Sequence, residues 1–309
     1  MNIQRLEFVL TEKCTSRCIH CQGEHSPERE GVMKVEDGLN YLDETTSVAK
    51  LESFMIFGGE SMLYPERTIK LFQKAKELGI PEIELITNGF WGKDVDRGRS
   101  LATQLRDSGV NEVLISVDAF HSPFIHLDYA RNAASACLTA GIRRVRWNVA
   151  ILESENAPNQ FDKQTRKIME MLAPLGLKKN VNKVWPQGRA RRTLAEFFPK
   201  QPLEGKCPEA ETALVNPTCI TMDPRGWASI CWSLSIGNAK KESLSKMLTS
   251  YHWKNHPIIK TLVEQGPKGL LELPETNGFQ FKENRYIDKC HLCMDIRKHL
   301  KPEYPEIFV

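Results

Sequence analysis

The first half of the chain alternates short runs of branched and aromatic residues with longer amphipathic runs. Runs rich in Ile, Val, Leu and Phe predict strands, and apolar residues recurring every three or four positions predict helices. Two of the helices are followed at once by glycine, at Gly79 and Gly141, where a left-handed conformation ends a helix. The predicted strands are 6–10, 53–57, 82–87, 112–117 and 145–151, and the predicted helices are 35–50, 64–78, 95–108 and 128–140.

This alternation restricts the fold to the α/β class with a parallel sheet and right-handed crossovers. A further helix–strand unit is predicted over 159–184, which brings the number of units to six. A closed (β/α)8 barrel needs eight, so the pattern favours an open, partial (β/α)6 TIM-like barrel or a doubly wound sheet. In both folds the functional groups gather at the C-terminal ends of the strands.

The pattern breaks after about residue 189, where prolines and glycines interrupt a cysteine-bearing region. A hairpin is predicted from 220–223 and 228–231, followed by helices near 243–249 and 257–265. We therefore expect a barrel domain over 1–195 and a small C-terminal Cys-rich domain over 196–309.

Composition excludes several function classes. Hydrophobic residues make up 41% of the chain and the net charge is only +3, so no strongly basic surface points to a nucleic-acid partner. Arg5 and Glu7 interrupt the N-terminal stretch, which excludes an obvious export signal. No segment approaches the roughly 18 apolar residues of a membrane span. We expect a cytoplasmic protein without a membrane partner.

Three of the nine cysteines follow the first strand as Cys14-x3-Cys18-x2-Cys21. In a reducing compartment, cysteines in such a cluster indicate metal binding rather than disulfides. Three thiolates can hold three irons of a [4Fe–4S] cube and leave the fourth iron open to a substrate or cofactor. The alternatives are buried structural cysteines, or a zinc site completed by His20 or His25.

The spacing resembles the signature of the radical S-adenosylmethionine (SAM) superfamily, whose C-x3-C-x2-C motif lies after the first barrel strand. His20 stands where the family usually has an aromatic residue. Gly58-Gly59-Glu60 at the end of the second strand resembles the family's Gly-Gly-Glu, with Ser61 in place of the usual proline. The resemblance implies that this triplet binds the amino group of SAM, since a carboxylate suits an ammonium group.

Polar residues close the later strands as well, and the resemblance implies that they line the SAM pocket. His121 is a candidate catalytic residue near the substrate, although it could simply start the next helix. A basic run over 178–192 could be a solvated face, or could bind an acidic substrate, a peptide leader or the SAM carboxylate. The candidate cofactor-binding residues beyond the glycine triplet are Asn88, Ser116, Asp118, Asn148 and Arg189.

A second cysteine group resembles the auxiliary-cluster region called twitch, a short form of the SPASM domain. The resemblance implies a second [4Fe–4S] cluster, whereas a zinc ribbon is the alternative for a C-x2-C pair. Cys207 could replace Cys219 as a ligand, and the thiol left free could donate a hydrogen atom to a substrate. Cys137 is expected in the core. The expected metal ligands of this group are Cys219, Cys231, Cys290 and Cys293, with Cys207 as a candidate catalytic residue.

The resemblance implies an enzyme that reductively cleaves SAM to a 5′-deoxyadenosyl radical, which abstracts a hydrogen atom from its substrate. We expect the substrate to be a ribosomally synthesised peptide, modified by epimerisation, cross-linking or thioether formation. The alternative is oxidation of a small-molecule alcohol or sugar, with the auxiliary cluster accepting the electron. A non-catalytic zinc or iron–sulfur scaffold is the alternative from another class.

The partners implied are a peptide or small-molecule substrate and an electron donor such as flavodoxin or ferredoxin. Because the chain opens directly at the first strand, we expect no fused peptide-recognition domain. A separate partner, or the barrel itself, would then bind a peptide leader.

Overall fold

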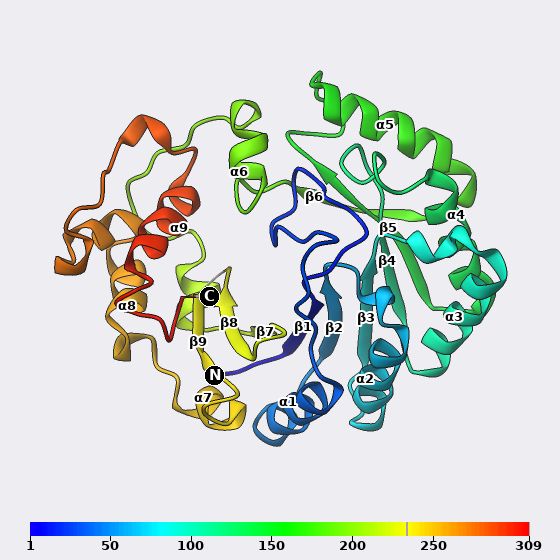
Figure 1. Cartoon of the computed structure of the whole chain (residues 1–309), viewed down its shortest axis with the longest axis horizontal. Coiled ribbons are helices and arrows are strands. Elements are labelled where there is room, and N and C mark those ends of the chain that lie inside the picture. The colour runs from blue at the N-terminus through cyan, green and yellow to red at the C-terminus, as the bar shows by residue number, and fades with distance from the viewer. Residues whose placement is uncertain (233, 309) are drawn as a thin grey trace.

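A single curved sheet of nine strands organises the computed structural model, which describes residues 1–232 and 234–308 (Figure 1). Six parallel strands follow one another in space in the order of the chain, without the reversal that defines a doubly wound sheet. Within the described residues the sheet does not close, which confirms the partial barrel. These strands are β1 (Arg5–Thr11), β2 (Ser53–Gly58), β3 (Glu82–Thr87), β4 (Glu112–Ser116), β5 (Arg144–Ile151) and β6 (Lys178–Lys183).

Five helices connect the parallel strands and cover the outer face of the sheet (Figure 1). Their ends follow local chemistry. The Asp94 side chain accepts a hydrogen bond from the Arg97 amide at the start of α3, and Gly141 ends α4 at a φ of 84°. In the described part of the chain, no helix combines the length and apolar character needed to cross a bilayer. The helices are α1 (Val35–Val48), α2 (Pro65–Glu77), α3 (Val95–Asp107), α4 (Leu127–Ala140) and α5 (Gln160–Leu172).

The main core lies between the sheet and these helices. Alternate residues of β1, namely Leu6, Phe8 and Leu10, are fully buried on this side. Phe54 of β2 packs edge-to-face against Phe8 and Phe72, with ring centroids 4.9 and 6.0 Å apart. The period-two pattern therefore sends the intervening residues of each strand to the concave face.

The C-terminal region extends the same sheet from its first strand. β7 (Cys219–Met222) pairs in parallel with β1, so that Cys219 lies opposite Arg5. The predicted hairpin is present, formed by β7 and β8 (Trp227–Cys231), and an unpredicted strand, β9 (Leu234–Asn238), continues it. A division of the chain near residue 195 stays a proposal, because both regions share one sheet.

The remaining helices gather beside β8 and β9 or link them to the barrel (Figure 1). Two of them match the predicted positions, whereas α9 was not predicted and carries two of the cysteines. Their bounds are α6 (Ala190–Thr193), α7 (Leu244–Ser250), α8 (Pro257–Glu264) and α9 (Lys289–Leu300).

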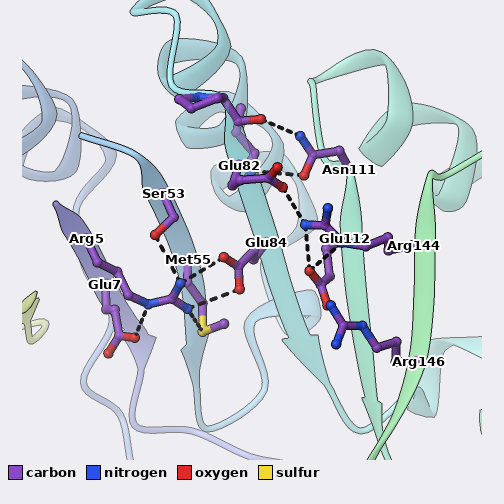
Figure 2. Close-up of polar contacts among 12 residues, drawn as sticks. Arg5, Glu7, Ser53, Met55, Glu82, Glu84, Asn111, Glu112, Arg144 and Arg146 are labelled. Atoms are coloured by element: carbon purple, nitrogen blue, oxygen red, sulfur yellow. Dashed lines mark hydrogen bonds and ion pairs between the residues drawn. The ribbon is translucent and has the colours of Figure 1, made fainter. Parts of the chain in front are cut away.

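Charged side chains crowd the N-terminal half of the concave face (Figure 2). The Arg5 guanidinium lies 2.7 Å from a Glu7 oxygen and 2.8 Å from a Glu84 oxygen. On the next strands, Glu112 binds Arg144 at 2.7 Å and Arg146 at 2.6 Å. Closed barrels fill this space with branched apolar residues. Here paired charges form a polar floor beneath the strand ends.

The aromatic packing around Phe54 predicts a large loss of stability on truncation. Phe54→Ala should lower the free energy of unfolding by about 3–5 kcal/mol, because the cavity between Phe8 and Phe72 cannot close fully. Chemical denaturation monitored by circular dichroism measures the change. Met171→Ala, at a side chain that is 59% exposed, is the matched control and should change stability by less than about 0.5 kcal/mol.

Candidate cofactor and substrate site

The first three cysteines lie on the loop that leaves β1 at the C-terminal edge of the sheet. The Cys14 amide donates to the Ser26 carbonyl at 3.0 Å, and the Cys21 amide donates to the Cys18 carbonyl at 3.1 Å. Burial raises the pKa of Cys14 to about 12, and burial followed by the neighbouring thiolates raises the pKa of Cys18. Three such thiols become thiolates together only when a cationic group binds them. The donor set therefore fits an iron–sulfur cluster.

Gly58 and Gly59 bring the end of β2 against the base of this loop. The Gly59 amide donates to the Thr11 carbonyl at 2.7 Å, and the Glu60 amide donates to the Lys13 carbonyl at 2.8 Å. A Cβ atom at Gly59 would lie 2.0 Å from the Lys13 carbonyl oxygen. Only glycine permits this approach, so the glycine pair fixes the position of the cysteine loop.

Glu60 is a buried carboxylate held in one orientation. Its oxygens accept hydrogen bonds from the Met62 amide at 3.0 Å, the Thr87 hydroxyl at 2.8 Å and the Asn88 amide at 2.7 Å. Burial raises the pKa of Glu60 to about 7 despite these bonds. A carboxylate in this state gains from a nearby ammonium group, as expected for the amino group of SAM.

Asn88 joins the end of β3 to the cysteine loop. Its side-chain amide donates to the Thr15 hydroxyl at 2.9 Å and lies 3.9 Å from the Cys14 sulfur. Its own carbonyl oxygen accepts from the Phe90 amide at 3.0 Å. The strand-end residues Glu60 and Asn88 thus lie together beside Cys14.

Asp118 and His121 form a buried pair after β4. One Asp118 oxygen lies 2.9 Å from His121 Nδ1, and the other accepts from the Ala150 amide at 3.0 Å. Burial would raise the pKa of Asp118, but His121 outweighs it and the pKa falls to about 2. His20 completes the group, with its ring 4.9 Å from that of His121. Burial lowers the pKa of His20 to about 4, so His20 is neutral at neutral pH beside the Asp118 carboxylate.

Ser116 and Asn148 lie apart from the pair, in a row of polar side chains on the concave face of β4 to β6. Asn148 Nδ2 lies 3.4 Å from the Ser116 hydroxyl, while its carbonyl oxygen accepts from Asn180 and Asn182 at 2.9 Å each. Sequence reasoning missed these last two residues. The alternation Asn-Val-Asn in a predicted strand was the signal that both face the same side as Asn148.

Arg189 contacts the cysteine loop rather than an open pocket. Its guanidinium donates to the carbonyls of Cys18 at 2.6 Å and His25 at 3.0 Å, and its amide donates to the Cys21 carbonyl at 3.0 Å. Gly188, at a φ of +53°, lies so close to the Gln22 carbonyl that no Cβ would fit. The segment after β6 therefore braces the loop from its outer side.

Four cysteines of the second group lie near one another, and the fifth, Cys219, lies apart from them. Burial raises the pKa of Cys207 to about 12, and the thiolates of Cys293 and Cys231 raise it as well. Burial likewise raises the pKa of Cys290 to about 12, with contributions from the other three thiols. Cys219 lies elsewhere, since after burial its pKa responds to Glu7 and Arg5. The group that could hold a second cluster is therefore Cys207, Cys231, Cys290 and Cys293.

A cavity of about 830 Å³ separates the two cysteine groups. Cys219 and Thr221 of β7 line its floor with Glu7 of β1, and Gln22 to His25 of the cysteine loop form one wall. Cys231 and α9 form the opposite wall. Its volume lies in the range of small-ligand sites. Glu60, Asn88 and Asp118 do not line it.

Comparisons with known proteins agree with this arrangement. Residues 8–148 match the model of the Radical SAM superfamily. A probable GTP 3′,8-cyclase of Methanocaldococcus jannaschii is 28% identical over 120 residues, or 38% of this chain and 38% of that protein. A putative peptide biosynthesis protein, YydG, of Bacillus subtilis is 26% identical over 126 residues, or 40% of this chain and 38% of that protein. The match thus spans 38% of the length of either relative.

One solved structure shares the fold over nearly the whole chain. Native anSMEcpe with bound AdoMet has a TM-score of 0.55 and 14% sequence identity, and the match covers 97% of both chains. The likeness includes the region after β6, so the C-terminal extension of the sheet belongs to a known architecture.

The close approach of Gly59 to the loop predicts the effect of adding one methyl group. Gly59→Ala should abolish iron binding by the first three cysteines while leaving the folded helix content near normal, because the Lys13 carbonyl must move. Iron and circular dichroism are measured after anaerobic reconstitution. Gly79→Ala, at positive φ but with open space around it, should cost about 1 kcal/mol of stability and retain the iron.

The Asp118–His121 pair predicts a pH-dependent stability. Burial lowers the pKa of His121, but Asp118 raises it above its ordinary value of 6.5, so the stabilisation is complete below that pH. It is lost as the pH rises through the folded-state pKa. The stability difference between wild type and His121→Gln should therefore be largest below pH 6.5 and shrink as the pH rises through the folded-state pKa of His121. A constant difference would contradict the prediction; His299→Gln, at an exposed histidine, serves as the control.

Proposed function

The chain belongs to the radical SAM superfamily of enzymes, and we propose that it modifies an unactivated C–H position of a ribosomally synthesised peptide. The observation that carries the proposal is a cavity lined by residues 22–25 of the cysteine loop, by Cys231 and by the Cys219 thiol. The Bacillus subtilis relative described as a peptide biosynthesis protein supports a peptide substrate. The cyclase relative matches a similar share of the chain, so the Cys219 thiol in the cavity is what favours peptide epimerisation.

When bound, the [4Fe–4S] cluster on Cys14, Cys18 and Cys21 supplies the electron that cleaves SAM to the 5′-deoxyadenosyl radical. The protein's own groups hold the cofactor and exclude water. Glu60 is suited to the SAM amino group because it is buried and oriented by three donors. Asn88 lies beside Cys14, and the Asp118–His121 pair lies beside His20.

For the auxiliary cluster we propose Cys207 as the fourth ligand, with Cys231, Cys290 and Cys293. The mutual effect of these thiols on their pKa values supports this set. Cys219 is then the free thiol, and its neighbours are Glu7 and Arg5 rather than other cysteines. The sequence spacing left open which of Cys207 and Cys219 is the ligand, and this proposal makes Cys207 the ligand and Cys219 the free thiol.

Cys219 is suited to return a hydrogen atom to the substrate. Burial and Glu7 raise its pKa to about 12, so the sulfur keeps its hydrogen at neutral pH. Transfer of this atom to a carbon radical forms a C–H bond and leaves a sulfur-centred radical on Cys219. One electron, from a donor such as flavodoxin or ferredoxin, and one proton restore the thiol. Among the expected peptide modifications, this chemistry corresponds to epimerisation.

Iron content tests the ligand assignment. Reconstituted wild-type protein should hold about eight iron atoms, as two [4Fe–4S] clusters require. Cys207→Ala should reduce this to about four, and Cys219→Ala should leave it unchanged. Iron loss in the Cys219 variant, with retention in the Cys207 variant, would assign the ligand the other way. Stoichiometric zinc without labile sulfide would show that the protein holds neither cluster and would contradict the proposal.

Isotope incorporation tests the role of Cys219. The assay combines dithionite and SAM in D2O with synthetic peptides encoded by genes adjacent to this one. Wild type should form 5′-deoxyadenosine and a peptide in which one residue has become the D-amino acid and carries one deuterium. Cys219→Ala should still cleave SAM but form at least about tenfold less epimer. A product lighter by two hydrogens would indicate cross-linking or thioether formation instead. Turnover only with alcohols or sugars would favour the small-molecule alternative.

A further inference from the structure

Arg297 is a buried cation beside the auxiliary cysteines. It lies on α9, four residues after Cys293 and seven after Cys290, so the three side chains share one face of the helix. Its side chain is among the buried charged groups, with 5% of the residue exposed. The helix that carries two of the expected cluster ligands therefore also carries a positive charge toward them.

The guanidinium is held by one bond and keeps two donors free. Nη2 donates to the Trp232 carbonyl at 2.8 Å, directly after Cys231. Nε and Nη1 are buried without a hydrogen-bond partner among the described residues. A buried donor without a partner costs about 1–3 kcal/mol, and more for a charged group. Two such donors on one guanidinium indicate an acceptor that occupies this position in the active protein.

No carboxylate near the cavity serves as that acceptor in the described part of the chain. Asp295 on the same helix pairs with Arg191 at 3.1 Å and Arg285 at 3.0 Å. The carboxylates that line the cavity also pair with other arginines: Glu7 with Arg5, Glu12 and Asp223 with Arg225, and Glu24 with Arg192. The cysteines on the same face of α9 are the group left for Arg297.

We propose that Arg297 donates its two free N–H groups to the sulfur atoms of the auxiliary cluster and so raises the cluster's reduction potential. The proposal rests on the auxiliary cluster of the proposed function. A [4Fe–4S] core held by four thiolates is an anion, and reduction makes it more negative. Hydrogen bonds and positive charge at its sulfurs therefore stabilise the reduced form. Arg297 is a positioning residue that tunes the cluster, not a catalytic residue.

The experiment uses the full chain with Cys14, Cys18 and Cys21 changed to Ala, so that only the auxiliary cluster remains. Its potential is measured by redox titration monitored by electron paramagnetic resonance. Arg297→Met removes the charge and the donors but keeps an apolar stem of similar length, a change that buried ion sites often tolerate. We expect the equilibrium constant for one-electron reduction to fall at least about tenfold, or about 59 mV toward more negative potential.

Two matched variants distinguish hydrogen bonding by Arg297 to the cluster sulfurs from an effect of its charge alone. Arg297→Lys keeps the charge without the planar fork and should fall between wild type and Arg297→Met. Lys298→Met removes an exposed cation from the next residue of α9 and should leave the potential unchanged. An equal shift in the Lys298 and Arg297 variants would mean that general charge sets the potential, and would overturn the proposal.

The iron content of each variant distinguishes an error in the auxiliary cluster from an error in the role of Arg297. If the protein without the first three cysteines holds no iron, the auxiliary cluster itself is wrong and the inference falls with it. If Arg297→Met holds full iron at an unchanged potential, the inference alone is wrong. In the enzyme that keeps its first three cysteines, an altered KM for substrate in Arg297→Met, together with an unshifted auxiliary potential, would assign Arg297 to substrate binding in the cavity and overturn the proposal. If Arg297→Met does not retain the cluster, an unshifted potential in Arg297→Lys overturns the tuning role.

Discussion

The hydrogen bonding of β1 along both of its edges is the constraint on which the rest of the structure depends. β2 pairs with one edge and β7 with the other, both in parallel. The loop leaving β1 carries the first three cysteines, and the start of β7 carries Cys219 opposite Arg5. One strand therefore sets the distance between the cofactor loop and the C-terminal region. A slip of one residue in the register between β1 and β7 would turn Cys219 away from the cavity.

Charge compensation explains how so polar a concave face persists. Arg5, Glu7 and Glu84 satisfy one another at the base of the cavity, and Glu112 pairs with two arginines of β5 (Figure 2). Buried ions of this kind cost free energy unless they are paired and hydrogen-bonded. At the thiols, burial outweighs the opposing charges of Arg189 and Arg297, so their pKa values rise. A cationic iron–sulfur core would therefore stabilise the thiolates of both cysteine groups.

Most of the barrel was predictable because its signals are local. Strand β3 begins and ends at the predicted residues, and α3 differs by one residue at its end, since alternation and capping act over a few positions. β9 and α9 were missed. β9 ends in Gly-Asn and lacks strong alternation, so its own sequence does not predict a strand. It forms a strand because it pairs with β8. α9 begins with a Cys-x2-Cys pair that suggests a loop, but Asp288 caps a helix there.

The sequence by itself determined the β/α alternation, the cysteine loop after β1 and the glycine pair that meets it, because each depends on neighbours along the chain. Only the tertiary structure decided that Cys207 lies with Cys231, Cys290 and Cys293, and that Cys219 faces the cavity. It also decided that Arg297 is buried on α9 with two donors that have no partner among the described residues. The spacing of Cys207 and Cys219 could not separate them, because the return of the chain from α6 to β7 and the docking of α9 are set by long-range packing.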